Sequence, residues 1–459
     1  MSFRRIKVMD VELSHPLQPI EGLYGYSALK VLVRLHGAPL GYIELPLSGG
    51  RCPAAALGRA ILEQHSWAII RHLVSDGLAA SVRRDQLRID DLAGLPHPIY
   101  EGPLPSVTVA VCTRDRAADL ALCLAALGRL EYPAYEVLVV DNAPSNDATE
   151  RLVRERYPDV RYVCEPRPGL DWARNRAILE ARGEIVAYTD DDVVVDPGWA
   201  AAIAQVFAEN PEVMAVTGLV MPYELETEAQ ILFEVYGGFG RGFERKWYRL
   251  DPKSRRQERL YAGSGIFGTG ANMAYRRSVF EQIGTFDPAL DVGTVTNGGG
   301  DTEMFFRVLK EGHTLVYEPC AIVRHRHRRD YDRLRTQIAN NGIGLYSYLV
   351  RTALAYPDSR STLFRLGLWW LWWWNVRRLL KSFIHPARFP RDLIWAELRG
   401  SFVGMRRYQQ ARRTADEIAR RFGPVVPSGA ASEPAAMDGV TKVVVLAGAV
   451  PSAPQELIS

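Results

Sequence analysis

Short apolar segments alternate with longer helical segments between residues 106 and 190, and this alternation limits the possible folds more than any other feature of the chain. The apolar segments are rich in β-branched residues, which favour strands. Strands are therefore expected at 107–112, 135–140, 160–164 and 184–188, and helices at 117–130, 148–157 and 172–181. Strands and helices that alternate at this spacing form βαβ units around a mainly parallel sheet. We therefore predict an α/β fold whose ligands bind beyond the carboxyl ends of the strands.

Charged residues gather at these strand ends. Asp190, Asp191 and Asp192 directly follow the fourth strand, and Asp141 directly follows the second. Three adjacent carboxylates at the edge of a buried element repel one another unless a cation compensates them. Oxygen ligands of this kind suit Mg²⁺ or Mn²⁺, ions that commonly hold a diphosphate. The alternative is a solvated acidic turn that caps a helix starting near Pro197.

Composition excludes several classes of protein. The 459 residues are enough for two or three domains, and the formal net charge of +3 gives no basic field that would make nucleic acid the default partner. The five cysteines are scattered singly without a Cys-x-x-Cys pair, which predicts a reducing compartment and no structural zinc. The amino-terminal residues lack an apolar signal core, so we expect a cytoplasmic location.

The chain divides into four predicted regions. We expect residues 1–100 to form a small α+β domain of unknown role. The proline-rich stretch 95–105 predicts a linker. The α/β domain covers 106–340, and a helical region rich in Trp and Arg covers 341–422. Residues 423–459, rich in Pro, Ala, Ser and Gly, are expected to be a disordered tail.

Five tryptophans stand close together in the helical region, between Trp369 and Trp374. The apolar run is shorter than the roughly 20 residues that a membrane-spanning helix needs. Arg365, Arg377, Arg378 and Lys381 flank it, so one expectation is peripheral contact with an anionic membrane surface at the inner face of the cell membrane. Packing into the core is the alternative.

The ordered motifs resemble those of the family 2 glycosyltransferases, inverting enzymes of the GT-A fold, over residues 106 to about 327. The strand ends supply Thr113-Arg-Asp-Arg116, Asp141-Asn142, Arg174-Asn175 and the triple aspartate. Farther along, Gly268 to Arg277 is similar to the family's acceptor-side segment, and Gly298 to Arg307 to the segment with the catalytic base. The usual Glu-Asp pair of that last segment is Gly300-Asp301 in this chain.

The resemblance implies a role for each of these positions. The donor nucleotide would contact Thr113, Arg114, Arg116, Asp141, Arg174, Asn175, Asp190 and Asp191. Mn²⁺ or Mg²⁺ would be bound by Asp190, Asp192 and His325, although the acid that binds the metal differs among members of the family. The acceptor would lie at Gly270 and Asn272. Asp301 would be the catalytic base, with Glu303 as second candidate; the structural alternative for Asp301 is a cap of the helix 302–310.

The implied reaction is metal-assisted transfer of a sugar, with inversion, from a nucleotide-diphosphate donor to an acceptor hydroxyl. The acceptor would be a glycan, a lipid-linked molecule or a small molecule, in cell-envelope glycan or glycolipid synthesis. Gln337 is followed by Ile-Ala-Asn-Asn instead of the Gln-x-x-Arg-Trp motif of processive members, which disfavours polymer synthesis. The alternatives are a degenerate sugar-nucleotide-binding module and a sugar nucleotidyltransferase; the latter usually needs a Gly-rich phosphate loop, which Cys112 to Arg116 does not supply.

Overall fold

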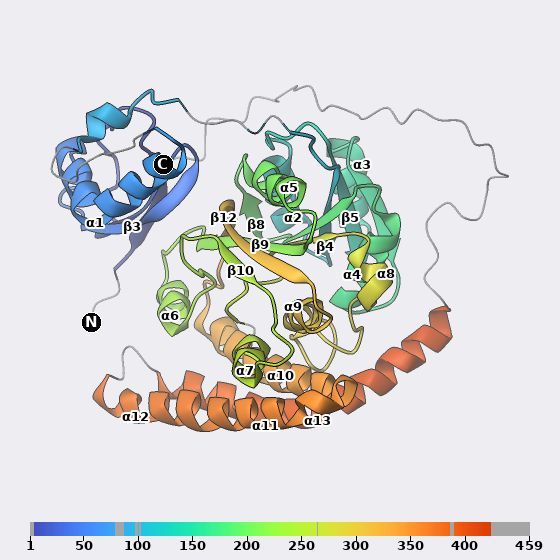
Figure 1. Cartoon of the computed structure of the whole chain (residues 1–459). Coiled ribbons are helices and arrows are strands. Elements are labelled where there is room, and N and C mark those ends of the chain that lie inside the picture. Colours follow the sequence, from blue (N-terminus) through green and yellow to red (C-terminus); the bar gives the residue numbers. More distant parts are fainter. Residues whose placement is uncertain are drawn as a thin grey trace, which may run out of the picture.

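The computed structural model describes residues 4–78, 87–96, 100, 102–263, 265–385 and 390–423. In this part of the chain, a nine-stranded sheet forms the centre of the molecule, and a separate three-stranded sheet lies at one side (Figure 1). A layer of long helices lies beneath the central sheet in the same view. The predicted fold class, a mainly parallel α/β sheet followed by a helical C-terminal region, is confirmed.

Four parallel strands form one half of the large sheet, in the order β7, β4, β5, β6. They are β4 (Val107–Thr113), β5 (Tyr135–Asn142), β6 (Arg161–Glu165) and β7 (Ile185–Asp190). Each starts and ends within two residues of the predicted segment. The register pairs Thr113 with Asp141 and Cys112 with Asp190, so the polar ends of three strands lie side by side.

The other half of the sheet is mixed. It contains β8 (Val193–Val195), β9 (Val213–Pro222), β10 (Lys246–Tyr248), β11 (Asn272–Arg276) and β12 (Thr314–His325). β11 lies antiparallel between β7 and β9, while β12 runs parallel to β9. β12 also pairs antiparallel with β8, with His325 opposite Val193. This pairing brings His325 to the turn that contains the triple aspartate.

Helices cover both faces of the large sheet. On one face, α2 (Ala117–Leu127) and α5 (Trp199–Glu209) pack in a core that includes Val109, Leu120 and Ile203. On the other face, α4 (Leu170–Glu180), α8 (Val279–Ile283) and α9 (Gly300–Lys310) pack in a second core with Tyr275 and Phe305. α3 (Ala148–Arg156), α6 (Glu228–Tyr236) and α7 (Arg255–Ala262) complete the layers. Burial on both faces explains the continuous apolar runs of the parallel strands.

The N-terminal residues form a unit with its own core. It consists of β1 (Ile6–Glu12), β2 (Ala28–Leu35), β3 (Ala38–Pro46), α1 (Ala54–Ser75) and the short helix η2 (Ile89–Leu92). Its contact with the large sheet is partly ionic, since Arg34 Nη1 lies 2.7 Å from Asp196 Oδ2. Leu32 adds an apolar contact, because it packs with Leu219, Met221 and Ile322.

The C-terminal helices form the layer beneath the sheet in Figure 1. They are α10 (Tyr331–Ala355), η3 (Pro357–Ser359), α11 (Arg360–Trp369), the π-helix η4 (Trp370–Val376), α12 (Arg377–Ile384) and α13 (Arg391–Phe422). α10 and α13 pack at van der Waals distance through glycines: a Cβ at Gly342 would lie 2.2 Å from the carbonyl oxygen of Glu397. Close backbone approach therefore holds this layer together.

The tryptophan cluster is exposed at some positions and partly buried at others. Trp372 is 73% exposed, and Trp369 and Trp373 are about half exposed, whereas Trp370 and Trp374 are partly buried and stack on each other. None of the described helices has both the length and the apolar character needed to cross a bilayer. The predicted tail, 423–459, lies outside the described residues apart from Gly423.

Candidate active site

The triple aspartate lies where β7 ends and turns into β8. Asp192 Oδ1 is 3.3 Å from His325 Nε2. Ligand atoms of Asp190, Asp192 and His325 all lie within 4.8 Å of one another. Two carboxylate oxygens and an imidazole nitrogen at this spacing can bind one divalent cation. The predicted metal ligands are therefore brought together.

Arg116 supplies counter-charge to the other side of the cluster. Its Nη1 lies 2.5 Å from Asp191 Oδ1, and its Nη2 lies 2.9 Å from Asp192 Oδ2. Asp191 Oδ2 accepts a hydrogen bond of 2.7 Å from Thr113 Oγ1. Asp191 thus ties the end of β4 to the acidic turn, and Asp190 and Asp192 are left as the acids beside His325.

The protonation of this cluster depends on burial. Burial, together with the neighbouring Asp192 charge, raises the pKa of Asp190 to about 7. Burial also lowers the pKa of His325 to about 4, so its ring is neutral at physiological pH and offers a lone pair. Burial opposes ionisation of Asp192 as well, but the charge and hydrogen bond of Arg116 and the charge of Arg328 outweigh it, so the pKa of Asp192 lies below its usual range. A bound cation would keep Asp190 ionised.

A chain of side chains orients His325. His325 Nδ1 lies 3.1 Å from His327 Nδ1, and His327 Nε2 lies 2.9 Å from Glu234 Oε1. Both histidines are buried and contact the Phe239 ring in edge-to-face geometry. Contacts on the second ring nitrogen fix the orientation of a metal-binding histidine. The arrangement therefore directs Nε2 of His325 toward Asp192.

The end of β5 provides a separate polar position. Asp141 is fully buried, and its Oδ2 accepts a hydrogen bond of 3.0 Å from the Tyr162 hydroxyl. Its Oδ1 has no hydrogen-bond partner within the described residues. Burial raises the pKa of Asp141 to about 6. A buried acceptor of this kind can take an N–H group of a ligand. Arg114, in contrast, is exposed on the neighbouring loop.

Asp301 lies in the first turn of α9 and not at its cap, because the helix begins at Gly300 and its cap is Gly299. Its Oδ2 accepts the Gly270 N–H at 2.7 Å, and its Oδ1 accepts the Thr302 N–H at 2.7 Å. Burial and the charge of Asp291 raise its pKa, although both amides favour the ionised form. Asp301 is therefore a half-buried carboxylate, held in place, with a proton affinity suited to a general base.

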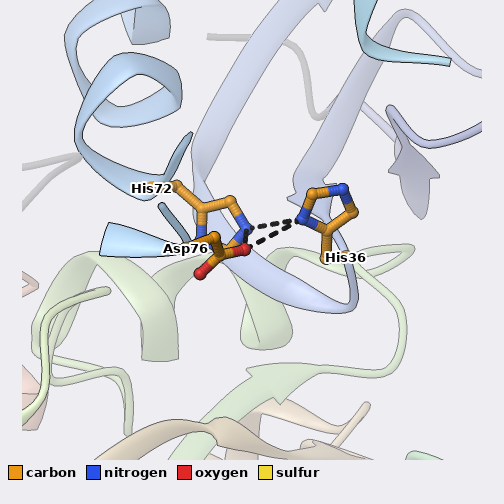
Figure 2. Close-up of side chains that lie close together, drawn as sticks. All are labelled: His36, His72 and Asp76. Atoms are coloured by element: carbon orange, nitrogen blue, oxygen red, sulfur yellow. Dashed lines mark hydrogen bonds and ion pairs between the residues drawn. The ribbon is translucent and has the colours of Figure 1, made fainter. Parts of the chain in front are cut away.

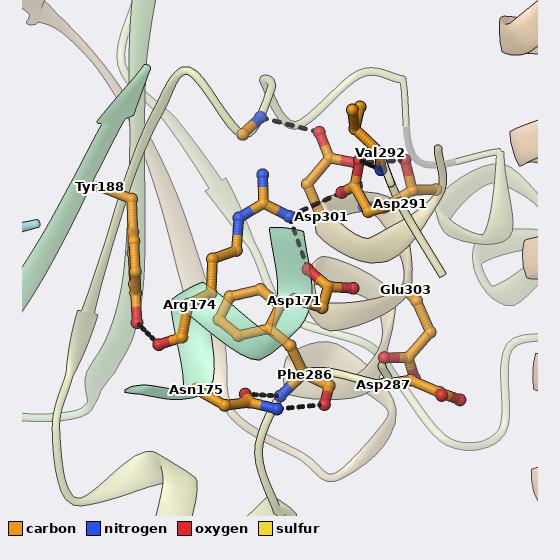
Figure 3. A network of polar contacts seen from close by, with 12 residues as sticks. Asp171, Arg174, Asn175, Tyr188, Phe286, Asp287, Asp291, Val292, Asp301 and Glu303 are labelled. Atoms are coloured by element: carbon orange, nitrogen blue, oxygen red, sulfur yellow. Dashed lines mark hydrogen bonds and ion pairs between the residues drawn. The ribbon is translucent and has the colours of Figure 1, made fainter. Parts of the chain in front are cut away.

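Arg174 lies among the carboxylates of Asp171, Asp291 and Asp301 (Figure 3). Its Nη1 lies 2.8 Å from Asp171 Oδ1 and 2.6 Å from Asp291 Oδ2. Its charge also interacts with Asp301 and Asp190. This buried guanidinium thus compensates carboxylates from the acidic turn, from α4 and from the α9 segment.

Glu303 occupies a different environment from Asp301. It is 1% exposed and forms a two-point ion pair with Arg307, and its Oε1 also contacts Arg351. Both carboxylate oxygens of Glu303 are therefore engaged by guanidinium groups within the core, and neither faces the space beside Gly270 that Asp301 borders. The geometry therefore favours Asp301 over Glu303 as the base.

Glycines at positions 300 and 270 leave room for the charged side chains of the site. A Cβ at Gly300 would lie 2.3 Å from Asp171 Oδ2 and 2.8 Å from Asp291 Oδ2. These two carboxylates occupy the space that a side chain at position 300 would need. This explains why position 300 is a glycine, although the resemblance predicts an acidic residue there. At Gly270, a Cβ would lie 2.6 Å from Arg174 Nη2.

The side chains of two predicted contact residues, Asn175 and Asn272, make hydrogen bonds that join segments of the fold. The Asn175 amide donates to the Phe286 carbonyl oxygen and accepts from the Phe286 N–H, both at 2.9 Å, and so joins α4 to the segment before α9. The Asn272 side chain is fully buried, donates to the carbonyl oxygens of Leu219 and Ala321, and accepts from the Trp199 indole. The Asn272 side chain thus holds β11 within the sheet, and its contact with the acceptor stays a prediction. Gly270 borders Asp301.

Sequence reasoning missed Asp171 and Asp291 as members of the site. Asp171 stands three residues before Arg174 on α4, a spacing that predicts an ion pair and could have identified it. Asp291 lies in an irregular segment at φ 68°, and no local pattern points to it.

Residues 108–284 match Glycosyl transferase family 2. Polypeptide N-acetylgalactosaminyltransferase 5 of Caenorhabditis elegans is 26% identical over 50% of this chain and 38% of its own length. The O-antigen biosynthesis protein RfbC of Myxococcus xanthus is 28% identical over 64% of this chain and 23% of its own length. The chain spans less than half the length of these relatives.

Among solved structures, a mannosyltransferase from Pyrobaculum calidifontis in complex with GDP-Man and Mn²⁺ is similar with a TM-score of 0.43. It is 19% identical, and the match covers 76% of this chain and 96% of that chain.

Proposed function

We propose that this chain, whose residues 108–284 match Glycosyl transferase family 2, transfers a sugar from a nucleotide-diphosphate donor to an acceptor hydroxyl, with inversion at the anomeric carbon. The observation that carries this proposal is the placement of two different acidic centres at one sheet edge. Asp190 and Asp192 lie beside a neutral His325, and Asp301 lies separately with its own hydrogen-bond donors. One centre suits a metal-bound diphosphate, and the other suits proton removal.

In the proposed reaction, Asp301 accepts the proton of the acceptor hydroxyl while that oxygen forms a bond to the anomeric carbon. The bond to the leaving diphosphate breaks on the opposite face, so the configuration inverts. Asp190, Asp192 and His325 would hold Mn²⁺ or Mg²⁺, which, when bound, neutralises charge on the leaving diphosphate. Arg174 stabilises the ionised carboxylates around the reacting centre.

Donor recognition is assigned to the loops after β4 and β5. Asp141 Oδ1, buried and without a partner among the described residues, would accept an N–H of the nucleobase. Thr113 and Arg116 bind Asp191 and so hold the acidic turn in place. The side chain of Arg114 is exposed and would contact phosphate oxygens of the donor.

The acceptor is proposed to belong to the cell envelope, as a glycan or a lipid-linked molecule, and transfer to be non-processive. The similarity to a protein named for O-antigen biosynthesis supports the first statement. The residues after Gln337 support the second, since they lack the motif of processive members.

The C-terminal layer is proposed to rest on the anionic inner face of the cell membrane. Trp372 is 73% exposed, and Phe364, Phe383 and Ile384 on the same helices are each more than 60% exposed. Arg377 lies over the Trp373 ring at 4.9 Å, and Arg391 lies over the Phe383 ring at 4.6 Å. Exposed aromatics with adjacent cations favour the headgroup region of a bilayer.

Analysis of the product tests the assigned chemistry. The purified chain is incubated with donor, acceptor and Mn²⁺, and the anomeric configuration of the product is determined by NMR. We expect a configuration opposite to that of the donor. A product with the donor's configuration would contradict the single displacement with Asp301 as base.

A further inference from the structure

A second group of metal-ligating side chains lies in the N-terminal unit, away from the proposed active site. His36 is in the turn between β2 and β3, and His72 and Asp76 are at the end of α1 (Figure 2). Their side chains are 1%, 14% and 15% exposed, respectively. The three side chains point toward one another, and nothing in the proposed glycosyl transfer uses them.

The spacing of the three donor atoms fits a tetrahedral ion. His36 Nδ1 lies 3.1 Å from His72 Nε2, His36 Nδ1 lies 3.1 Å from Asp76 Oδ2, and His72 Nε2 lies 3.1 Å from Asp76 Oδ2. Zinc bonds of about 2.0 to 2.1 Å in tetrahedral geometry separate neighbouring ligand atoms by about 3.3 Å. The three atoms thus form a nearly equilateral triangle of the required size.

The three atoms can each offer a lone pair to a cation. An imidazole nitrogen without a hydrogen and an ionised carboxylate oxygen are both lone-pair donors. A cation at the centre of the triangle would therefore replace the contacts among the three side chains.

The backbone holds these ligands in position. His36 and Gly37 form the two-residue turn with φ of 52° and 77°, a conformation that favours Asn or Gly over His. Glu12 fixes this turn, because its Oε1 accepts the His36 N–H at 3.0 Å and its Oε2 accepts the Gly37 N–H at 2.9 Å. His72 and Asp76 stand four residues apart on one face of α1, at the helix end whose dipole favours a cation.

We propose that His36, His72 and Asp76 bind a zinc ion that joins the β2–β3 turn to the end of α1. Two imidazoles and one carboxylate at tetrahedral spacing suit Zn²⁺ better than Mn²⁺ or Mg²⁺, which prefer octahedral oxygen ligands. All three residues line a cavity of about 1270 Å³ between the N-terminal unit and the large sheet, and water from this cavity would supply the fourth ligand. No cysteine takes part, so cysteine spacing could not reveal the site.

Metal analysis of the full-length chain tests this proposal. Asp192→Asn serves as the background, because it weakens the separate acidic cluster, which could also bind zinc. After incubation with ZnCl₂ and gel filtration, we expect about one zinc ion per chain in this background and close to none after adding His72→Gln or His36→Asn. Asn suits a positive φ, so His36→Asn preserves the turn. His15→Gln, which changes an exposed histidine of the same unit, should retain the ion.

Co²⁺ binding provides a readout that does not depend on variants that fold poorly. Co²⁺ added to the metal-free Asp192→Asn protein should give the intense visible bands of a tetrahedral site, and one equivalent of Zn²⁺ should abolish them. The proposal is overturned if the Asp192→Asn protein retains no zinc, if His72→Gln and His36→Asn retain as much as His15→Gln, or if Co²⁺ shows only weak octahedral bands. These experiments do not measure donor turnover. A failure of the zinc proposal therefore leaves the proposed transfer reaction unaffected, and a failure of the transfer reaction leaves the zinc proposal unaffected.

Discussion

Asp301→Asn separates proton removal from donor binding. Asn has nearly the same shape as Asp, but its amide has one acceptor oxygen where the carboxylate accepts from both Gly270 and Thr302. One of these N–H groups would face the new NH₂ group, a loss of about 1 to 3 kcal/mol of folding stability. A general base contributes about 10² to 10⁴ in rate, so kcat should fall by that factor, or about 3 to 5.5 kcal/mol in activation free energy.

The assay is single-turnover release of nucleoside diphosphate in the presence of acceptor, with donor affinity measured separately by calorimetry. Donor affinity should stay within a few-fold of the wild-type value, because Asp301 does not belong to the proposed diphosphate site. The wild-type rate should also rise with pH through the pKa of Asp301, which burial raises above its usual range, and this limb should disappear in the variant.

Glu303→Gln is the matched control for this experiment. It removes a buried partner of Arg307 and Arg351 and should lower the free energy of unfolding by about 3 to 5 kcal/mol, visible as a lower Tm. Turnover per folded molecule should change little. Near-normal turnover of Asp301→Asn, together with a collapse of turnover in folded Glu303→Gln, would refute the assignment of the base.

Four further predictions concern other parts of the molecule. His325→Gln should weaken Mn²⁺-dependent binding of a nucleoside diphosphate by about 10- to 100-fold, and unchanged metal dependence in calorimetry would exclude His325 as a ligand. Donor affinity should decrease as pH falls through about 6, because burial raises the pKa of Asp141 to that value and a protonated Asp141 no longer accepts at both oxygens; a flat profile between pH 5 and 7 would contradict the nucleobase contact. Gly270→Ala should lower kcat without preventing folding, because the added methyl group would lie 2.6 Å from Arg174 Nη2 and 3.3 Å from Asp301 Cβ. Kinetics and thermal unfolding are measured on the same preparation, and an unchanged kcat together with an unchanged Tm would contradict this prediction. Trp372→Ser should weaken the affinity for anionic vesicles, measured by co-sedimentation, by about 10- to 150-fold, which corresponds to the roughly 1.5 to 3 kcal/mol that burying a large apolar side chain contributes. Trp67→Ser, at an exposed Trp of α1, should not weaken it.

The parallel half of the sheet could be predicted because its signal is local. β4, β5, β6 and β7 are continuous β-branched runs separated by helices, and their carboxyl ends carry polar residues that have no role in a core. From this pattern alone, Asp141 and Asp190 are expected at one sheet edge, and the register places them there.

The mixed half of the sheet could not be predicted with the same reasoning. β9 and β11 are buried on both faces and lack alternation, and β11 joins the sheet between two strands far from it in sequence. The same long-range pairing explains why Asn272, predicted at the acceptor, lies in the core. Asp291 reaches the site from an irregular segment whose conformation depends on the final packing.

The histidine cluster of the N-terminal unit illustrates a similar limit. His72 and Asp76 have helical spacing that a sequence can reveal, but the third ligand, His36, comes from a hairpin turn 36 residues away. Only the packing of α1 against the sheet brings the three together.

The central claim is that the acidic turn and Asp301 together form a metal-dependent sugar-transfer site. The most direct measurement is the release of nucleoside diphosphate from a panel of UDP, GDP and TDP sugars, each with Mn²⁺ and with EDTA, alongside binding of the same donors by calorimetry. We predict that at least one donor that binds is also turned over, and that EDTA abolishes turnover and added Mn²⁺ restores it. Donor binding without turnover of any sugar, or turnover that EDTA leaves unchanged, would contradict the account.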